Sequence, residues 1–490
     1  MTQRLLHLFL TFGIITVGFA QDYTTPNTGM IYSLDDLVTE SPSTMSVSGA
    51  TYTMVGNITI SENDTLLIDS DLTLEIGAEL LITVFGTFTV TAEDVTFTAI
   101  DTAAPYEGFR FEEFSEVDIQ NSTIQYGGGL RVLTETFTLN NCTVTNNVSG
   151  AATGSVIALS RGVAQITNNS ITFNETPAIS SGANNAVSAY IFNNYIEGNN
   201  QENSNRPQIN MGATMTTDTL KIIQNTIKGD VSLTSVGGIA VANLVGGNVK
   251  AIIDDNIIQD NRYGITVVGG NSFAYIRDNI IEDNDTQNNP NLGGSGISLS
   301  NGSNSMDVVA RGNQIRRNLW GITVLSGASI NLGDDDGNAG QNVFSDNGNG
   351  GTTYALYNNT SNTLSAMNNC WDEANAPITL EDAEAVIVHQ VDDSSLGEVL
   401  FDPVNCVFLG VDPISSENIA IYPNPTEGRL FIANNSEFNT LNVYTLEGKL
   451  IFESPLNTGT QELYLDLHTG MYLMELKGAN VGLIKKLMVN

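Results

Sequence analysis

Apolar side chains recur along this chain in short runs that alternate with polar residues and end at turns. Between Thr167 and Asn347 the pattern becomes one phrase, Asn-x-apolar-x-x-Asn, which occurs seven times with a single Asp in the last position. The central apolar residues of successive phrases lie 25, 31, 31, 23, 34 and 29 positions apart. A unit that recurs every 20 to 50 residues or so is typical of solenoids, propellers and arrays.

The asparagine that opens each phrase predicts a ladder of side-chain hydrogen bonds. One unit cannot bury its apolar side chains alone, so successive units are expected to stack as parallel coils around a continuous core. Asparagine tolerates the left-handed backbone of a tight corner, and its amide can bond the asparagine of the next coil. With coils about 4.8 Å apart, a dozen coils would form a rod on the order of 60 Å long. The expected ladder residues are Asn169, Asn194, Asn225, Asn256, Asn279, Asn313 and Asn342.

The apolar residues of these phrases are expected to form one internal column. The same register extends backwards and forwards along the chain, and a second strand announced by Gly-Ile follows several of the phrases, as at Gly264-Ile265. The predicted column contains Phe97, Ile124, Val144, Ile171, Ile196, Ile227, Ile258, Ile281, Ile315, Phe344 and Trp371.

These Asn-x-Ile-x-x-Asn and Gly-Ile-x-Val units resemble the repeats of right-handed parallel β-helix proteins of the pectate-lyase-like superfamily. The resemblance covers roughly residues 55–405 and implies an all-β fold. We therefore predict a right-handed parallel β-helix solenoid over residues 55–408, with a capping segment at its C-terminal end. Residues 21–54 show no periodicity and are interpreted as an N-terminal lead-in or cap. The superfamily includes lyases, hydrolases, epimerases and adhesins, so this resemblance does not decide the function.

Beyond a linker predicted at residues 409–417, the chain alternates apolar and polar residues in seven short segments. This spacing predicts a small antiparallel β-sandwich over residues 418–490. Its motifs Tyr-Pro-Asn-Pro-Thr-Glu-Gly, Gly-Met-Tyr and Lys-Lys-Leu-Met-Val closely resemble the type A C-terminal sorting domain of the type IX secretion system. The resemblance implies that the type IX machinery is a partner and exports the protein across the outer membrane. The motif residues are Pro423, Asn424, Pro425, Gly428, Gly470, Tyr472, Lys485 and Lys486.

The N-terminal residues 1–20 have the pattern of a secretory signal peptide. Arg4 supplies a positive charge, an apolar segment follows, and Ala20 provides a small residue for cleavage before Gln21. No other stretch is apolar enough to cross a bilayer, so no transmembrane segment is expected in the mature chain. The expected location is extracellular or on the outer-membrane surface.

The charge balance narrows the possible partners. The chain contains 54 Asp and Glu residues against 18 Lys and Arg, a formal net charge of −36 at pH 7. Such a surface repels phosphate backbones, so nucleic acid is not an expected partner. Three cysteines are too few for a disulfide framework. Cys142 falls in a repeat position and is expected to be a small core residue, and the sequence leaves open whether Cys370 and Cys406 pair.

An acidic triplet is the candidate metal site. Asp334, Asp335 and Asp336 stand on a predicted loop, where carboxylates can converge on a hard cation such as Ca²⁺. The triplet lacks the spacing of an EF-hand loop, and a solvated turn is the alternative interpretation. No other cofactor is expected, since the chain has no His/Cys spacing typical of zinc.

Two basic residues present a similar choice. Arg316 and Arg317 occupy the same places in their phrase as Glu282 and Asp283 in an earlier one. Stacked coils would pair these charges across the surface, a structural role. A catalytic arginine is the alternative, but no catalytic residue is assigned.

The favoured function is non-catalytic binding of glycans or of neighbouring surfaces. The chain has no Gly-His-Gly motif, and His389 and His468 lie outside the repeats. A polysaccharide lyase, or a related carbohydrate-active enzyme, and a structural surface spacer are the alternatives. Aromatic residues on the coils are candidates for a sugar-stacking strip, with interior packing as the alternative. They are Tyr190, Tyr195, Tyr263, Phe273, Tyr275 and Trp320.

Overall fold

A computed structural model describes residues 22–302, 306–406 and most of 420–489 of the protein. Within the last range the description omits residues 423–425, 427, 435–437, 446–448, 458, 466, 469 and 479–481. The chain divides into two compact units, one ending at Cys406 and the other beginning at Val407. The predicted signal peptide, the predicted linker and the motif residues Pro423, Asn424 and Pro425 lie outside the described residues.

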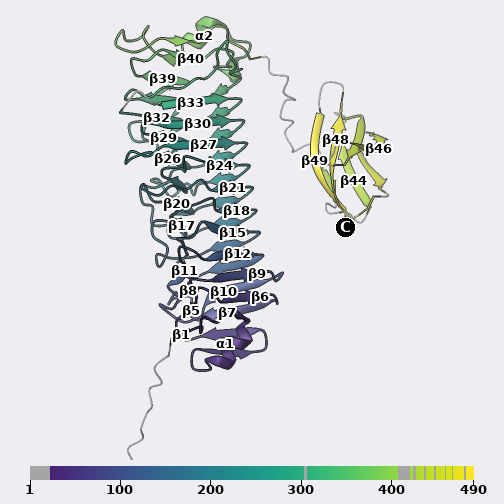
Figure 1. The fold of residues 1–490 in the computed structure, drawn as a ribbon. Helices are drawn as coiled ribbons and strands as arrows, with labels where there is room; N and C mark the ends of the chain where they lie inside the picture. Colours follow the sequence, from purple (N-terminus) through teal and green to yellow (C-terminus); the bar gives the residue numbers. More distant parts are fainter. Residues whose placement is uncertain are drawn as a thin grey trace, which may run out of the picture. The chain divides into compact units, whose positions relative to one another are not determined.

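The first unit is a stack of coils that builds three long parallel sheets, here called A, B and C (Figure 1). Sheet A has 14 strands, in the order β1 (Tyr23–Thr24), β5 (Ile58–Ile60), β8 (Leu81–Val84), β11 (Gly108–Phe111), β14 (Leu130–Val132), β17 (Ile157–Leu159), β20 (Ile179–Ser181), β23 (Ile209–Met211), β26 (Ile239–Ala242), β29 (Ile265–Val268), β32 (Ser295–Ser300), β35 (Trp320–Leu325), β39 (Leu356–Asn359) and β41 (Ile387–Val388). Sheet B has 11 strands, in the order β2 (Ile31–Tyr32), β6 (Thr65–Ile68), β9 (Thr87–Val90), β12 (Glu116–Gln120), β15 (Thr136–Asn140), β18 (Gln165–Thr167), β21 (Tyr190–Phe192), β24 (Leu220–Ile223), β27 (Val249–Asp254), β30 (Ser272–Arg277) and β33 (Met306–Arg311). Sheet C has 13 strands, in the order β3 (Met45–Ser48), β4 (Thr51–Met54), β7 (Leu72–Ile76), β10 (Val95–Ala99), β13 (Ser122–Gln125), β16 (Thr143–Thr145), β19 (Ser170–Thr172), β22 (Tyr195–Glu197), β25 (Thr226–Lys228), β28 (Ile257–Gln259), β31 (Ile280–Glu282), β34 (Gln314–Arg316) and β36 (Val343–Ser345).

The predicted apolar column is confirmed. Ile171 pairs with Ile196, and the register continues without a slip along sheet C to Phe344. The ring of Phe344 stacks on Trp371 with centroids 4.9 Å apart. All of these side chains are buried, so one column of side chains forms the sheet C wall of a continuous core.

The glycines that announce the second strand stack on one another. A Cβ added at Gly238 would lie 2.5 Å from the carbonyl oxygen of Gly264, and one at Gly264 would lie 2.4 Å from that of Gly296. The backbone of the next coil therefore leaves no room for a side chain at these positions. The isoleucine that follows each glycine enters the core, where Ile239, Ile265 and Ile297 are in register.

The seven ladder asparagines bond one another in sequence. Each side-chain N–H donates to the carboxamide oxygen of the asparagine one coil further on, at 2.9–3.0 Å, and the last, Asn342, donates to Asn369. The same amides also donate to main-chain carbonyls, as Asn256 does to Ile222. All seven are buried, and a buried polar group without partners would destabilise the fold.

The expected backbone geometry of the ladder is wrong by one residue. The left-handed conformation belongs to the residue before the ladder asparagine, as at Asn168 (φ 58°) and Asn193 (φ 53°). Asn121 and Asn141 in earlier coils have the same conformation, which leaves Ser122 and Cys142 in the ladder position. The corner therefore has two positions, one that turns the chain and one that bonds the next coil.

The asparagine that closes each phrase forms a second ladder. It runs through Asn147, Asn174 and Asn199, and again from Asn261 onwards through Asn284, Asn318 and Asn347. The phrase with Asp230 in this place contributes no rung. Gln208 fills the gap, because its oxygen accepts from Asn199 at 3.1 Å and its amide donates to Asn261 at 3.1 Å.

Aromatic rings fill the core of the N-terminal coils, where Leu72 and Val95 occupy the ladder position. Phe88, Phe97, Phe109, Phe111 and Phe137 pack with neighbouring centroids 5.3–6.2 Å apart. All five are buried. This end of the core is therefore held by apolar burial and ring contacts.

The coils begin before residue 55, the start that the apolar alternation suggested. Strands β1 and β2 pair with the first full coil, and the antiparallel hairpin β3–β4 joins sheet C. Helix α1 (Leu34–Glu40), capped by Ser33, buries Leu34 and Leu37 against the end of the core. The sequence showed no helical period here because α1 has only seven residues.

Asp64 fastens the loop between β1 and β2. Its buried carboxylate accepts hydrogen bonds of 2.8–3.1 Å from the backbone N–H groups of Asn27, Thr28, Gly29 and Met30. Burial alone would raise the pKa of Asp64, but hydrogen bonds from Thr25 and from this backbone outweigh it and lower the pKa below its usual value.

The second unit is the predicted antiparallel sandwich, with its own core. Strands β43 (Ala420–Tyr422), β44 (Arg429–Asn434) and β47 (Gly459–Tyr464) form one sheet, and β46 (Leu450–Pro455), β45 (Thr440–Tyr444), β48 (Gly470–Lys477) and β49 (Gly482–Val489) form the other. Gly428 has φ 94°, a conformation that favours glycine. The Tyr472 hydroxyl donates to the carbonyl of His468 at 2.8 Å. Gly470, Lys485 and Lys486 lie in the β48–β49 pair.

Replacing one ladder residue tests the contribution of the amides. Asn256→Ala would leave the backbone and side-chain N–H groups of Asn225 without their shared acceptor and remove the bond to the Ile222 carbonyl, while the Asn279 amide oxygen would keep only the backbone N–H of residue 256. We expect the free energy of unfolding to fall by about 3 kcal/mol, measured by urea unfolding. The outward-facing variant Gln259→Ala should change it by less than about 0.5 kcal/mol. Equal stability of the two variants would contradict a stabilising ladder.

Asp64→Asn tests the N-terminal anchor through its pH dependence. The folded pKa of Asp64 lies below its unfolded value, so its contribution is complete above about pH 4 and is lost as the pH falls through the folded pKa. At neutral pH the variant should be less stable by about 2 kcal/mol. The difference in unfolding free energy between wild type and variant should shrink as the pH falls below about 4. A difference that does not vary with pH would refute the assignment.

Candidate functional site

A groove of about 530 Å³ lies on the outer face of sheet A near the C-terminal end of the coils. Strands β32, β35 and β39 form its floor, and the loop that precedes β32 forms one wall. Its lining residues are Pro290, Asn291, Leu292, Gly293, Ser295, Ser298, Trp320, Thr323, Leu325, Tyr357 and Asn359.

The central feature of the groove is a half-buried aromatic cluster. The Trp320 ring lies 5.5 Å from that of Tyr357 with an interplanar angle of 21°, and 4.6 Å from that of Tyr354. The indole N–H donates to the carbonyl of Pro290 at 3.0 Å, which fixes the ring in the loop wall. Three rings held together in this way present an apolar surface that needs no rearrangement to receive a ligand.

Hydroxyl groups stand beside the rings. The oxygen atoms of Ser295 and Thr323 are 2.9 Å apart, and Thr323 donates to Ser298 at 3.2 Å. The exposed amide of Asn359 lies at the edge of the groove. Hydroxyls and amides both donate and accept, which suits a ligand rich in hydroxyl groups.

The groove contains no strong acid or base. Among the described residues that line it there is no carboxylate, imidazole, ammonium or guanidinium group. Its geometry therefore supports stacking and hydrogen bonding, and Tyr357 is the one titratable group among the described lining residues.

The six aromatic residues singled out in the sequence fall on different surfaces. Only Trp320 lies in the groove, and Tyr195 is exposed on sheet C with its hydroxyl bonded to Glu197. Tyr263 packs its ring over Gly237, where an added Cβ would lie 2.1 Å from the ring. The remaining three, Tyr190, Phe273 and Tyr275, lie on sheet B.

Two rings that pack on Trp320, one of them lining the groove, were missed in the sequence. Tyr354 and Tyr357 lie outside the Asn phrases, in the coil that leads to β39. The signal that identifies Tyr357 is the register of sheet A, since it pairs with Thr323, three residues beyond Trp320. Finding that register requires the row of sheet A isoleucines, which includes Ile297 and Ile322, to be continued to Leu356.

The three aspartates of the predicted calcium site, Asp334, Asp335 and Asp336, lie on a turn. Asp334 uses its carboxylate to accept the backbone N–H groups of Asp336 and Asn338 at 2.9 Å. The Asn338 N–H is the main cause that lowers the pKa of Asp334. Asp335 and Asp336 are exposed, and no group of three or more His, Cys, Asp or Glu side chains in the described part of the chain is arranged to hold a metal. The triplet is a turn organised by its first aspartate.

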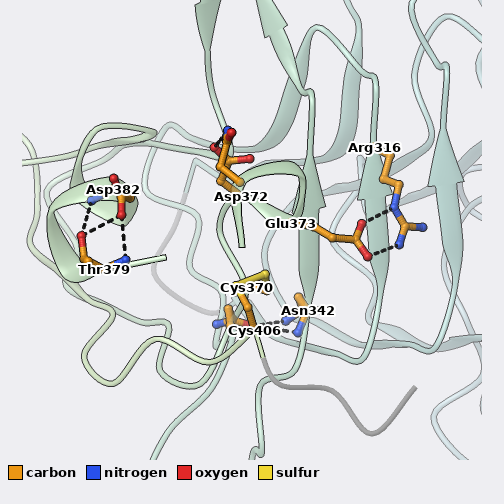
Figure 2. The surroundings of a disulfide bond; sticks show 10 residues. Arg316, Asn342, Cys370, Asp372, Glu373, Thr379, Asp382 and Cys406 are labelled. Carbon is orange, nitrogen blue, oxygen red and sulfur yellow. Dashed lines mark hydrogen bonds and ion pairs between the residues drawn. A yellow bond between two sulfur atoms is a disulfide. The ribbon is translucent and has the colours of Figure 1, made fainter. Parts of the chain in front are cut away.

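Stacking of the coils was predicted to pair Arg316 and Arg317 with Glu282 and Asp283. The prediction is confirmed for Arg317 only. Arg317 bonds Glu282 at 2.8 Å and Asp283 at 2.7 Å, as stacking of the coils implies. Arg316 instead forms a two-point contact with Glu373, at 2.8 and 3.1 Å (Figure 2). Both guanidinium groups are engaged in ion pairs, which is a structural arrangement.

A cap closes the C-terminal end of the coils. It contains β40 (Leu364–Ser365), η1 (Glu373–Asn375), α2 (Leu380–Glu384), β42 (Val399–Leu400) and, just before them, the hairpin β37 (Gly348–Asn349) and β38 (Thr352–Thr353). Cys370 and Cys406 are joined by a disulfide, which the sequence had left open (Figure 2). Strand β41 of the cap pairs with β39 and sets Val388 beside Tyr357. The cap therefore supports one end of the aromatic groove.

His389 has a structural position in this cap. Its Nδ1 accepts the backbone N–H of Val399 at 3.1 Å, which leaves the proton on Nε2 facing Glu384 at 3.1 Å. The ring is buried and far along the chain from the groove-forming loop. It links α2 to β42.

Comparison with known proteins finds a family model for the C-terminal sandwich and another for part of the coils. Residues 420–490 match the family model described as secretion system C-terminal sorting domain. Residues 247–378, within the coils, match a model described as protein of unknown function (DUF1565). No match was found among curated proteins.

One similar solved structure is an alginate lyase from Paenibacillus sp. str. FPU-7. The two sequences are 11 % identical, and the TM-score is 0.26. The matched region covers 77 % of this chain and 99 % of the lyase chain. A likeness this distant supports no inference about activity.

The stacked sheets and the terminal sandwich place the protein among the secreted parallel β-helix proteins. More particularly, it is a β-helix protein that carries a C-terminal sorting domain of the type IX secretion system. The domain directs it to the cell surface or the extracellular space. None of the described helices is long and apolar enough to cross a membrane.

Reduction of the disulfide should loosen the cap. The bond closes a loop of 36 residues, and loop-closure entropy predicts a stabilisation of about 4 kcal/mol. We expect dithiothreitol to lower the urea midpoint of the wild type. The double variant Cys370→Ala/Cys406→Ala should start at that lower midpoint and not respond to the reductant. A response of the double variant would mean that another feature, not this disulfide, is sensitive.

Proposed function

We propose that the protein is a non-catalytic glycan-binding protein of the cell exterior, and that the groove over sheet A is its binding site. The observation that carries the proposal is the fixed cluster of Trp320, Tyr354 and Tyr357 beside a row of hydroxyl groups. Sugar rings present apolar C–H faces and a rim of hydroxyls, which match the two kinds of surface in this groove.

The absence of charged groups from the lining favours an uncharged glycan. A carboxylate or sulfate in this groove would lose water and gain no ion pair, which costs free energy. A neutral polysaccharide meets no such penalty. The groove is about 530 Å³, a size within the usual range for small-ligand sites.

The two alternative functions make different demands. A polysaccharide lyase needs a base near the bond that breaks, and among the described lining residues only the hydroxyl of Tyr357, whose ring stacks on Trp320, is of a type that can serve. A structural spacer needs no preformed aromatic surface at all. Binding without catalysis uses every feature of the groove.

Trp320→Ala tests the proposal on the purified mature protein. We expect at least a tenfold loss of affinity for neutral polysaccharides such as laminarin, mannan or xylan, which is about 1.4 kcal/mol, by isothermal titration calorimetry. Tyr195→Ala removes an exposed aromatic ring from sheet C and serves as the matched control. Urea unfolding of both variants verifies that the fold is retained.

Two results would contradict the proposal. One is a wild-type protein that binds no neutral polysaccharide, or binds it equally well without the Trp320 ring. The other is an increase in ultraviolet absorbance from unsaturated products when the protein is incubated with polysaccharides, since this would show lyase activity.

A further inference from the structure

A second surface, on the outer face of sheet B, combines aromatic rings with basic groups. It covers the five strands β21, β24, β27, β30 and β33, and we call it the sheet B strip. Four spacings of about 4.8 Å give it a length of about 19 Å. Its rings are Tyr190, Phe192, Phe273 and Tyr275, its cations Lys221, Lys250, Arg277 and Arg311, and its carboxylates Asp254 and Asp307.

The register sets these groups in rows along the stack. Tyr190 pairs with Lys221, which pairs with Ile252, and Tyr275 follows in the same row. Lys250 pairs with Phe273, which pairs with Asp307 in the neighbouring row. An extended polymer that lies along the stack would therefore meet rings and charges in turn.

The charge of the strip is opposite to that of the protein. Four cations against Asp254, Asp307 and the edge residue Asp278 give 4 − 3 = +1, while the chain as a whole has −36. Salt screens charges beyond about 8 Å at physiological ionic strength. A bound polymer therefore responds mainly to the strip and much less to the distant acidic surface.

Three of the four cations have no carboxylate partner. Lys221, Lys250 and Arg311 form no ion pair with any described residue, and Asp254 pairs with Arg277 at 2.6 Å. Arg277 and Arg311 stand opposite each other on adjacent strands, where Asp254 bonds only Arg277 and Asp278, at the edge of the strip, attracts both guanidinium groups. An anion bound beside Arg311 would give this guanidinium an ion pair of its own.

Tyr275 holds both guanidinium groups in place. The guanidinium carbons of Arg277 and Arg311 each lie 5.3 Å from the centre of the Tyr275 ring. Cation–π contacts of this kind restrict a flexible side chain before a ligand arrives. Less conformational entropy is then lost on binding.

A hollow lies beside the most exposed ring. It has a volume of about 430 Å³ and is lined by Lys250, Phe273 and Asp307, among others. Phe273 is 38 % exposed, an uncommon position for an apolar ring in the middle of a sheet. The hollow offers a place where a sugar ring can rest on Phe273 with an acidic substituent near Lys250.

We propose that the sheet B strip binds an anionic polysaccharide, whose sugar rings stack on the aromatic side chains and whose carboxylate or sulfate groups pair with Lys250 and Arg311. The two carboxylates within the strip favour a polymer with about one charge per sugar over a nucleic acid, since duplex DNA carries one charge per 1.7 Å or so. This site is distinct from the uncharged groove over sheet A in position and in ligand.

The test compares dextran with its carboxymethyl and sulfate derivatives, because the three share one backbone and differ in charge. We expect the mature protein to bind both derivatives at least tenfold more tightly than dextran, with an affinity for the derivatives that falls as salt rises. Lys250→Ala/Arg311→Ala should weaken this binding at least tenfold and reduce its salt dependence. Phe273→Ala should weaken binding and leave the salt dependence unchanged.

Matched controls separate this proposal from the proposed function. Arg131→Ala removes another arginine without an ion pair among the described residues, from the outer face of sheet A, and should have no effect. Trp320→Ala should retain binding of the charged dextrans while losing neutral glycans. If the double variant loses its fold by urea unfolding, the exposed single change Lys250→Glu replaces it and should also abolish binding.

Several outcomes would overturn the proposal. Binding of unmodified dextran with the same affinity, or full binding by a folded double variant, would remove the role of the cations. Polyglutamate or single-stranded DNA binding as tightly as the charged dextrans would show that the strip recognises charge without sugar.

Discussion

Parallel stacking of coils leaves polar backbone and amide groups inside the wall of the solenoid, where water cannot reach them. The asparagine ladders satisfy these groups, since each amide bonds both the main chain and the amide of the next coil. The bonds repeat at the strand spacing and so couple the coils between Cys142 and Asn369 to one another. Coil length can then vary between 23 and 34 residues, because only the wall and its corners must stay in register.

This constraint divides each strand into an inner and an outer face with different freedom. Inner positions carry isoleucine or valine, and the corner positions carry asparagine. Outer positions face solvent and can change without disturbing the stack. Both candidate binding surfaces lie on outer positions, the uncharged groove on sheet A and the basic aromatic strip on sheet B. A rigid wall also holds their rings at a fixed spacing, which loops could not do.

The sequence was sufficient where a residue type repeats in register. The column from Phe97 to Trp371 followed from spacing alone, and the terminal sandwich followed from alternation and motifs. Gln208 could not be predicted as a member of the second ladder. It lies outside the repeat phrase in which Asp230 replaces the closing asparagine. The same limit applies to Tyr357 and to the strip, whose members are brought together only by the pairing of strands.

Charge was also difficult to interpret from the sequence. A net charge of −36 drew attention to the acidic triplet, yet Asp334 uses its carboxylate to shape a turn. The positions of the few basic residues were more useful than those of the many acidic ones for predicting contacts between coils. Arg317 pairs as stacking required, whereas Arg311 contacts the Tyr275 ring and forms no ion pair with a described residue, since Asp254 bonds the neighbouring Arg277.

The interactions that stabilise the coils change near Cys142. On one side the phenylalanine rings hold the core, and on the other the asparagine ladder begins with the bond from the Cys142 N–H to Asn169. Burial raises the pKa of this thiol to about 12, so it remains protonated and unreactive in the closed stack. The other two cysteines form a disulfide, so Cys142 is the free thiol of the chain. The rate at which an alkylating reagent modifies Cys142 would therefore measure how often the coils on either side of it separate.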